Sequence, residues 1–408
     1  MDKIVENEEI KPIEIIPGAP VEGENFFGRK KELEILKDTL LKPGVSVLIP
    51  GPRRWGKSSY VRECMRRYES ELTAIYIDLH RVHSLKEFYD LIMKQKEHSS
   101  IEFFSMKVED LFKNIINKGS EIINKVSICE AEISIGRLSD KSNHDMMENL
   151  MSILIKLRDK NIILILDEIS DFVMDIQNKY GKNDAIEFLR WLRTLRNHQK
   201  IQMVITGSIS IKSVLRELQV QDLINDMKEI ELKPLNKKDS QLFFKCLLKS
   251  KEIEIKGDAL KFCEEKLIKE AHYFIQLFAD CIVENCSTGQ IIEEAEEIKE
   301  IYHELTSKTS EALEDYHSRL MEHFNATDGD CAKIILAHLY AAVLDFEDIY
   351  ALTGARLQTK QKLLDLLIRL EEEGYIINDD DKYTFISRIL ADYWHKHFRY
   401  DKGEDICV

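Results

Sequence analysis

The chain has 408 residues, of which 44% are hydrophobic and 32% are charged, and its formal net charge is −15. Single hydrophobic cores stop growing near roughly 250 residues, so this length predicts more than one domain, and the acidic balance excludes general binding to duplex DNA unless basic residues gather on one face. No apolar run approaches the roughly 20 residues of a membrane helix and the eight cysteines form no CxxC pair, so we expect a cytoplasmic protein with reduced thiols.

The first half of the chain is predicted to be an extended arm followed by an α/β domain. Residues 1–24 mix acidic and apolar residues around three prolines, which predicts an extended arm, with order beginning at Asn25. Short apolar runs at residues 45–49, 74–79, 162–166 and 201–205 alternate with segments of helical periodicity. Strands that alternate with helices predict a parallel sheet with right-handed crossovers.

The remaining segments are predicted to be mainly helical. Residues 86–149 are longer than one crossover needs, and residues 130–138 alternate as an edge strand does, so we expect an insertion of helices and a hairpin. Three helices near 331–343, 346–353 and 357–373, followed by short strands at 375–377 and 383–386, fit a winged-helix pattern. The expected domains are an arm (1–24), a core (25–235), a helical lid (236–318) and a winged-helix domain (319–408).

Residues 51–58, GPRRWGKS, fit the phosphate-loop pattern G-x-x-x-x-G-K-[ST] and lie between an apolar strand and a helix. Glycines let such a loop turn its N–H groups toward a phosphate, and the dipole of the helix adds to the attraction. We expect Lys57 to reach the β- and γ-phosphates of ATP and Ser58 to bind Mg²⁺. The alternative is a glycine turn beside a surface lysine, and Trp55 is expected either on the rim or against the nucleotide. The loop residues assigned to nucleotide binding are Gly51, Pro52, Arg53, Arg54, Trp55, Gly56, Lys57, Ser58 and Ser59.

The apolar strand at 162–166 ends in Asp167 and Glu168, at the sheet edge where α/β folds bind ligands. We expect Asp167 to hold Mg²⁺ through water and Glu168 to polarise the attacking water. The alternative is a strand that ends in solvated acids. After the strand at 201–205, Thr206 or Ser208 is expected either to contact the γ-phosphate or the water, or to form an ordinary strand exit. We assign catalysis to Glu168, Lys57 and Ser208.

Together these segments resemble the prokaryotic "archaeal ATPase" family, which is close to the AAA+ and STAND ATPases and more distantly related to Orc/Cdc6 initiators. The matching segments are FFGRKKELEIL, GPRRWGKSS, YIDL, LILDE, ITGSIS and KEIELKPLNKKDS. The resemblance implies an α/β fold with a P-loop parallel sheet, a helical lid and a C-terminal winged helix, acting as an ATP-driven switch. It also implies that Phe27 and Arg29 lie near the adenine, while the alternative for Arg29 is a solvated residue in a first helical turn.

The resemblance leaves the source of a catalytic arginine open. Relatives carry an arginine shortly before the segment matching IELKPL, where this chain has Asp226-Met227-Lys228. The alternatives within the chain are Arg53 or Arg54 in the loop and a helix face bearing three arginines at spacing three. That face either pairs with nearby acids or faces the γ-phosphate of a neighbouring copy. The three residues are Arg190, Arg193 and Arg196. We therefore expect slow hydrolysis without a partner or an oligomer.

The charge of the C-terminal domain separates two functions. Residues 321–408 contain ten lysines and arginines against seventeen aspartates and glutamates. A helix that reads DNA should carry a clustered basic face. The sequence therefore favours an ATP-hydrolysing switch that acts on a protein partner or a neighbouring effector, or on further copies of itself. The alternative is an ATP-regulated DNA-binding protein.

Overall fold

The computed structural model describes residues 10–94, 101–104, 109–110, 113–114, 141–158, 161–207, 211–307, 311–398, 400–401 and 404–405. These residues form two compact units. The sheet unit comprises Arg29–Arg53 and Lys57–Leu232, and the helical unit comprises the described residues of Met1–Gly28, Arg54–Gly56 and Lys233–Val408. The main chain passes from the helical unit to the sheet unit after Gly28, belongs to the helical unit again at Arg54–Gly56, and returns to it after Leu232.

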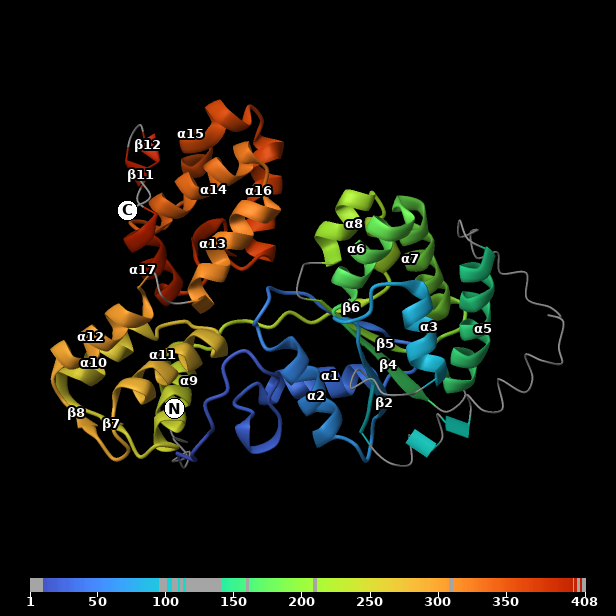
Figure 1. Cartoon of the computed structure of the whole chain (residues 1–408), viewed down its shortest axis with the longest axis horizontal. Coiled ribbons are helices and arrows are strands. Elements are labelled where there is room, and N and C mark those ends of the chain that lie inside the picture. The colour runs from blue at the N-terminus through green and yellow to red at the C-terminus, as the bar shows by residue number, and fades with distance from the viewer. Residues whose placement is uncertain are drawn as a thin grey trace, which may run out of the picture. The chain divides into compact units, whose positions relative to one another are not determined.

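The sheet unit is built on six strands in the order β3-β2-β4-β5-β1-β6 (Figure 1). All neighbours are parallel except β2 and β3, which are antiparallel. The strands are β1 (Val47–Ile49), β2 (Thr73–Asp78), β3 (Ile101–Phe103), β4 (Ile162–Asp167), β5 (Met203–Thr206) and β6 (Lys228–Glu229). The helices are α1 (Lys30–Leu40), α2 (Lys57–Arg67), α3 (Leu85–Lys94), α5 (Lys141–Arg158), α6 (Ile169–Tyr180), α7 (Lys182–Asn197) and α8 (Ile211–Leu218).

Burial explains why the apolar runs form the centre of this sheet. All six residues of β4 are buried, because the strand has a parallel neighbour on each side and helices on each face. Leu48, Ile75 and Leu164 join one core with residues of α3, α5, α6, α7 and α8. These helices lie on one side of the sheet (Figure 1). Side chains alternate along a strand, so Tyr76 and Asp167 point to the opposite face.

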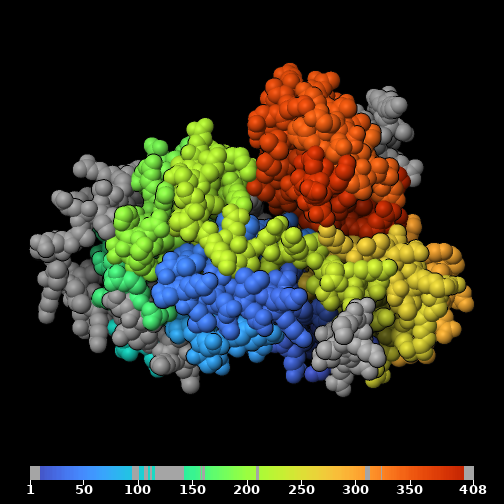
Figure 2. Space-filling view, turned by 180° about the vertical axis from the view of Figure 1, so that it is seen from behind, coloured from blue at the N-terminus to red at the C-terminus, as the bar shows by residue number. Residues whose placement is uncertain are grey.

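The helical unit contains the C-terminal elements and the N-terminal arm, and its orange and red residues form one continuous mass in Figure 2. Its helices are α9 (Lys237–Lys249), α10 (Gly257–Lys266), α11 (His272–Asn285), α12 (Ala295–Leu305), α13 (Glu311–His323), α14 (Ala326–Leu339), α15 (Phe346–Leu357), α16 (Lys360–Glu372) and α17 (Arg388–His397). Its strands are β7 (Glu254–Ile255), β8 (Ile291–Ile292), β9 (Ile376–Asp379), β10 (Lys382–Phe385), β11 (Tyr400–Asp401) and β12 (Glu404–Asp405). Helices α14 to α16 followed by the antiparallel pair β9 and β10 have the element order of a winged helix.

The described part of the N-terminal arm before Gly23 contains no helix or strand, and it contacts helices ahead of Asn25, where order was expected to begin. Ile13 is buried, and its N–H donates to the carbonyl of Cys246 in α9 over 3.0 Å. The N–H of Ile16 donates to the side chain of Gln276 in α11 over 2.7 Å. The described part of the arm is therefore fixed to two helices by backbone hydrogen bonds, which an extended segment can offer along its whole length.

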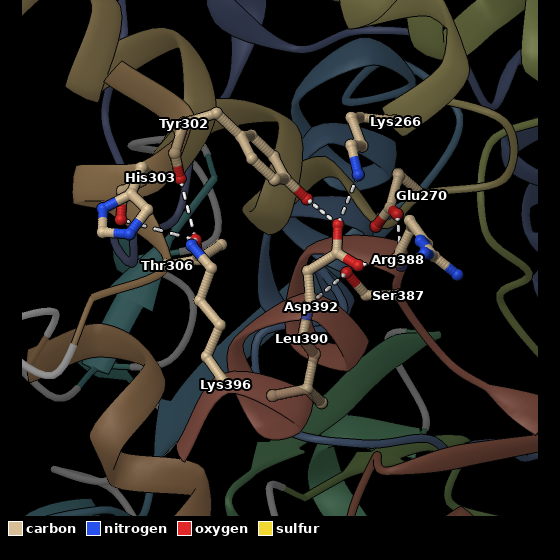
Figure 3. Close-up of polar contacts among 10 residues, drawn as sticks. All are labelled: Lys266, Glu270, Tyr302, His303, Thr306, Ser387, Arg388, Leu390, Asp392 and Lys396. Atoms are coloured by element: carbon tan, nitrogen blue, oxygen red, sulfur yellow. Dashed lines mark hydrogen bonds and ion pairs between the residues drawn. The ribbon is translucent and has the colours of Figure 1, made fainter. Parts of the chain in front are cut away.

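A buried polar cluster ties α17 to α10 and α12 (Figure 3). The carboxylate of Asp392 in α17 accepts hydrogen bonds from Lys266 over 2.6 Å and from Tyr302 over 2.8 Å. The carboxyl of Glu270, just before α11, accepts the N–H of Arg388 over 2.7 Å at the first turn of α17. A buried carboxylate needs such partners, so the cluster specifies how α17 is seated on α10 to α12.

Several predicted elements differ from the structure. The lid at 236–318 was expected to be helical, yet β7 and β8 form a two-stranded parallel ribbon within it. The edge strand expected at 130–138 lies outside the described residues. Among the described residues, no helix has the length and apolar character to cross a membrane.

Candidate nucleotide site

Four parallel strands of the sheet unit end at the same edge. In the sheet register, Ile49 of β1 is paired with Thr206 of β5, and Asp78 of β2 is paired with Asp167 of β4. Strand β5 lies between β1 and β4, so the phosphate loop, Thr206 and Asp167 follow one another along this edge. The carboxyl edge of a parallel sheet is where α/β folds bind ligands.

The phosphate loop connects β1 to α2 with three residues in the left-handed region of φ. These are Gly51 (φ 137°), Arg54 (φ 63°) and Gly56 (φ 80°). A Cβ added at Gly56 would meet no atom within 4 Å, so its backbone angle, rather than lack of space, requires glycine there. Arg54 adopts this conformation despite its side chain, at a cost of order 1 kcal/mol that the loop must offset.

Lys57 is the first residue of α2 and is buried. Its Nζ donates to the carbonyl of Gly51 over 2.8 Å and to that of Pro52 over 2.6 Å. Burial lowers the pKa of Lys57 to about 8, against the opposing effect of the Glu168 and Asp167 carboxylates. A buried ammonium that rests on loop carbonyls can exchange them for phosphate oxygens, which would strengthen its charged form.

Asp167 is buried, and both oxygens of its carboxylate accept hydrogen bonds. The hydroxyl of Tyr76 in β2 donates to Oδ2, and the hydroxyl of Thr206 donates to Oδ1. The N–H of Glu168 also donates to Oδ1, over 3.1 Å. These donors compensate for the loss of water around a buried carboxylate and fix its orientation.

Glu168 and Ser58 are two further residues with side-chain oxygens at this edge of the sheet. Glu168 is half-buried and has φ 58°, in the turn between β4 and α6, and Ser58 is half-buried in the first turn of α2. Hydroxyl and carboxylate oxygens suit Mg²⁺, which keeps several waters and binds one or two protein groups together with phosphates. The described residues contain no cluster of three metal-binding side chains, which is compatible with this mode of binding.

The remaining loop residues divide by burial. Arg53 is exposed, whereas Pro52 and Ser59 are buried. Trp55, expected on the rim or against a nucleotide, is also buried, with 6% of its surface exposed. The guanidinium of Arg54 lies 4.7 Å from the centre of the Tyr273 ring and 3.5 Å from the carboxylate of Asp315, all within the helical unit.

Phe27 and Arg29 were expected near an adenine, and they belong to different units. In the helical unit, Phe27 stacks on Phe243 with ring centres 4.9 Å apart, and its carbonyl is 3.0 Å from Nε2 of His272. In the sheet unit, Arg29 caps α1 with φ 55° and is 7% exposed. The solvated first-turn position considered for Arg29 is therefore wrong. Burial lowers the pKa of Arg29, and its Nη2 lacks a hydrogen-bond partner among the described residues.

The sequence did not identify every residue of this site, and one residue that it assigned is not described by the structure. Ser208, assigned to catalysis, lies outside the described residues. Thr206, which was considered with Ser208 either for a contact with the γ-phosphate or the water or as an ordinary strand exit, donates to Asp167. Tyr76 was noted only within the family segment YIDL, and no spacing rule connects it to an aspartate 91 residues away.

The three arginines at spacing three all pair with acids of the sheet unit, as one of the two readings expects. Arg196 is buried, whereas Arg190 and Arg193 are more exposed. The pairs are Arg190 with Glu187, Arg193 with Asp222, and Arg196 with Asp226.

Comparison with known proteins shows the family and the fold of the chain. A family model described as an ATPase domain predominantly from Archaea matches residues 26–264. The Walker-type ATPase of Pyrococcus abyssi aligns over 95% of this chain and 99% of its own, with 18% identity and a TM-score of 0.56. The ORC2 protein of Aeropyrum pernix, in a structure of ADPNP-ADP complexes, aligns over 92% and 95%, with 12% identity and a TM-score of 0.51. At these identities the structures establish a shared P-loop ATPase fold. No curated protein matches the sequence.

Proposed function

Because the chain belongs to the family of ATPase domains found predominantly in Archaea, we propose that it binds ATP with Mg²⁺, hydrolyses it, and serves as a nucleotide-dependent switch. The observation that carries this proposal is the placement of Lys57 and Asp167–Glu168 at one edge of the sheet. The charges of Glu168 and Asp167 act on Lys57, about 110 residues earlier in the sequence, and oppose the lowering of its pKa by burial. A structural ion pair would not need a glycine-bounded loop before the lysine.

Each residue has a distinct task in the proposed reaction. Lys57 exchanges the carbonyls of Gly51 and Pro52 for β- and γ-phosphate oxygens, and Ser58 and Asp167 would hold Mg²⁺, which neutralises phosphate charge. Glu168 accepts a proton from water while the water oxygen attacks the γ-phosphorus and ADP leaves. The half-buried position of Glu168 allows a water molecule to reach it.

We further propose that the helical unit delivers the nucleotide state to a protein partner or to other copies of the chain. Two basic side chains in its winged-helix elements are paired with acids: Lys360 with Glu347, and Lys382 with Asp345 over 3.2 Å. Paired bases leave little positive potential for a nucleic-acid backbone. With no arginine assigned to the γ-phosphate, hydrolysis by the isolated chain should be slow.

Substitutions of Lys57 and Glu168 test the site. Lys57→Ala should lose tight ATP binding, because the ammonium contacts phosphates in the ground state. Glu168→Gln should bind ATP as tightly as the parent protein and lose turnover, because the carboxylate acts on water. ATP binding is measured by calorimetry and phosphate release by a coupled assay.

Lys86→Ala, at an exposed lysine of α3, is the matched control and should behave as the parent protein does. Equal hydrolysis by the parent and both site variants would reject the assignment. Loss of ATP binding in Glu168→Gln would instead reject the separate roles given to the two residues.

A further inference from the structure

Tyr76 lies in β2 on the sheet face opposite α3, α5, α6, α7 and α8, and it is 3% exposed. A buried tyrosine must place its hydroxyl against a hydrogen-bond partner. Most side-chain hydrogen bonds go to the backbone or to water, as for Tyr60, which donates to the carbonyl of Glu32 over 2.5 Å. Tyr76 instead donates to the carboxylate of Asp167, the residue assigned to Mg²⁺.

The hydrogen bonds of Asp167 distinguish its two oxygens. An ionised carboxylate offers about four lone-pair sites, two on each oxygen. Oδ1 accepts from the hydroxyl of Thr206 and from the N–H of Glu168, so its two sites are used. Among the described residues, Oδ2 accepts from Tyr76 alone, which leaves one of its sites. A water molecule bound to a metal ion would therefore donate to Oδ2.

The position of the Tyr76 ring is itself fixed by neighbouring elements of the sheet unit. The guanidinium of Arg62, on α2, lies 5.2 Å from the ring centre. Arg62 also donates to the carboxylate of Glu102 in β3 over 2.6 Å. Helix α2, which follows the phosphate loop, and the edge strand β3 thus both help to hold the ring whose hydroxyl reaches Oδ2. Through Tyr76, the orientation of Asp167 depends on α2.

We propose that Tyr76 is a positioning residue for magnesium, which fixes Oδ2 of Asp167 as the oxygen that faces the metal-bound water. The inference rests on the proposed ATPase function and assigns a further residue to its metal site. Outer partners of metal ligands typically change metal affinity or activity by about 10–100-fold when they are removed. Tyr76 should therefore act on metal affinity and leave the nucleotide contacts of the phosphate loop unchanged.

Tyr76→Phe removes only the hydroxyl, and Tyr60→Phe is the matched control at a buried tyrosine of the same unit. Binding of Mn²⁺ to the full chain with ADP is followed by electron paramagnetic resonance, and ADP affinity is measured separately in EDTA. We expect Mn²⁺ affinity in Tyr76→Phe to fall by about tenfold. Tyr60→Phe should match the parent protein in Mn²⁺ affinity, and all three proteins should bind ADP equally in EDTA. The Mg²⁺ concentration for half-maximal hydrolysis should rise in parallel.

A thermal melt establishes that both variants are folded. If Tyr76→Phe does not fold, Arg62→Met keeps the hydroxyl while removing the guanidinium over the ring, and it should also weaken Mn²⁺ binding. Mn²⁺ affinity equal to that of the parent, or an equal loss in Tyr60→Phe, overturns the positioning role. If the parent protein itself shows no metal-dependent nucleotide binding, the proposed function fails instead.

Discussion

The spacing of Arg196 in the sequence places it on a charged helix face, but its side chain is buried in the structure. Its side chain is 2% exposed and bonds the carboxylate of Asp226 over 2.9 and 3.1 Å and the carbonyl of Leu223 over 2.5 Å. Burial raises the pKa of Asp226, but the hydrogen bonds and charge of Arg196 outweigh this and leave the pKa below its usual value. The pair therefore joins α7 to the segment after α8.

We expect Arg196→Ala to lower the free energy of unfolding by about 3 kcal/mol, because Asp226 loses its counter-charge in a partly buried position. Arg190→Ala is the control, since Arg190 is 56% exposed and its pair with Glu187 should contribute less than about 1 kcal/mol. Urea unfolding measures both variants. Equal stability of the two variants would mean that the Arg196 pair contributes no more than a surface pair.

The residues that could be predicted are those that stand together in the sequence. Gly51 to Ser58 form one pattern, and Asp167 and Glu168 end one apolar run, so local spacing indicated their chemistry. Tyr76 and Thr206 meet Asp167 across 91 and 39 residues, and only the strand order brings them together. The burial of Arg196 depends likewise on where α7 packs.

Glu270 shows how one titratable group connects elements, in this case the segment before α11 and the first turn of α17. Burial raises its pKa to about 8, although the N–H of Arg388 opposes this, and the carboxylate of Asp392 adds to the rise. In the unfolded chain the group titrates near its usual 4.5. Its contribution to stability is therefore fully present below pH 4.5 and is lost as the pH rises through 8.

The side chain of Glu270→Gln stays neutral at every pH, so this variant should not lose that stability as the pH rises through 8. The free energy of unfolding of the variant, relative to the parent protein, should rise between pH 5 and about pH 9. Denaturant unfolding at several pH values measures the difference. Glu265→Gln, at an exposed residue of α10, should show a much smaller change with pH. A pH-independent difference for Glu270→Gln would mean that Glu270 has the same pKa in the folded and unfolded states.

Helices and strands could be predicted where a segment was long enough to show a hydrophobic pattern. The four apolar runs correspond to β1, β2, β4 and β5 because these strands are buried on both faces. Strands β6, β7 and β8 have two residues each. Two residues are too few to show the alternation of apolar and polar residues that predicts a strand.

For the whole molecule, the acidic charge predicts weak binding to duplex DNA. Affinity for DNA comes largely from neutralised phosphates. The chain has a net charge of −15, and Lys360 and Lys382 of the winged-helix elements are already paired with acids. We expect a dissociation constant above roughly 10⁻⁶ M at physiological salt in fluorescence anisotropy, with and without ATP. Submicromolar affinity that weakens with added salt would favour the DNA-binding alternative. Binding of a fluorescent ATP analogue under the same conditions serves as the control for active protein.

The division of the chain has a consequence for the order of folding during synthesis. The sheet unit is almost continuous in sequence, whereas the helical unit takes residues from before and after it. Domains generally fold as they leave the ribosome, N-terminal parts first. The N–H of Ile16 nevertheless cannot form its hydrogen bond with Gln276 until that residue, 260 positions later in the chain, has been synthesised. In the nascent protein the arm therefore stays open to proteases and chaperones while the ATPase core is already forming.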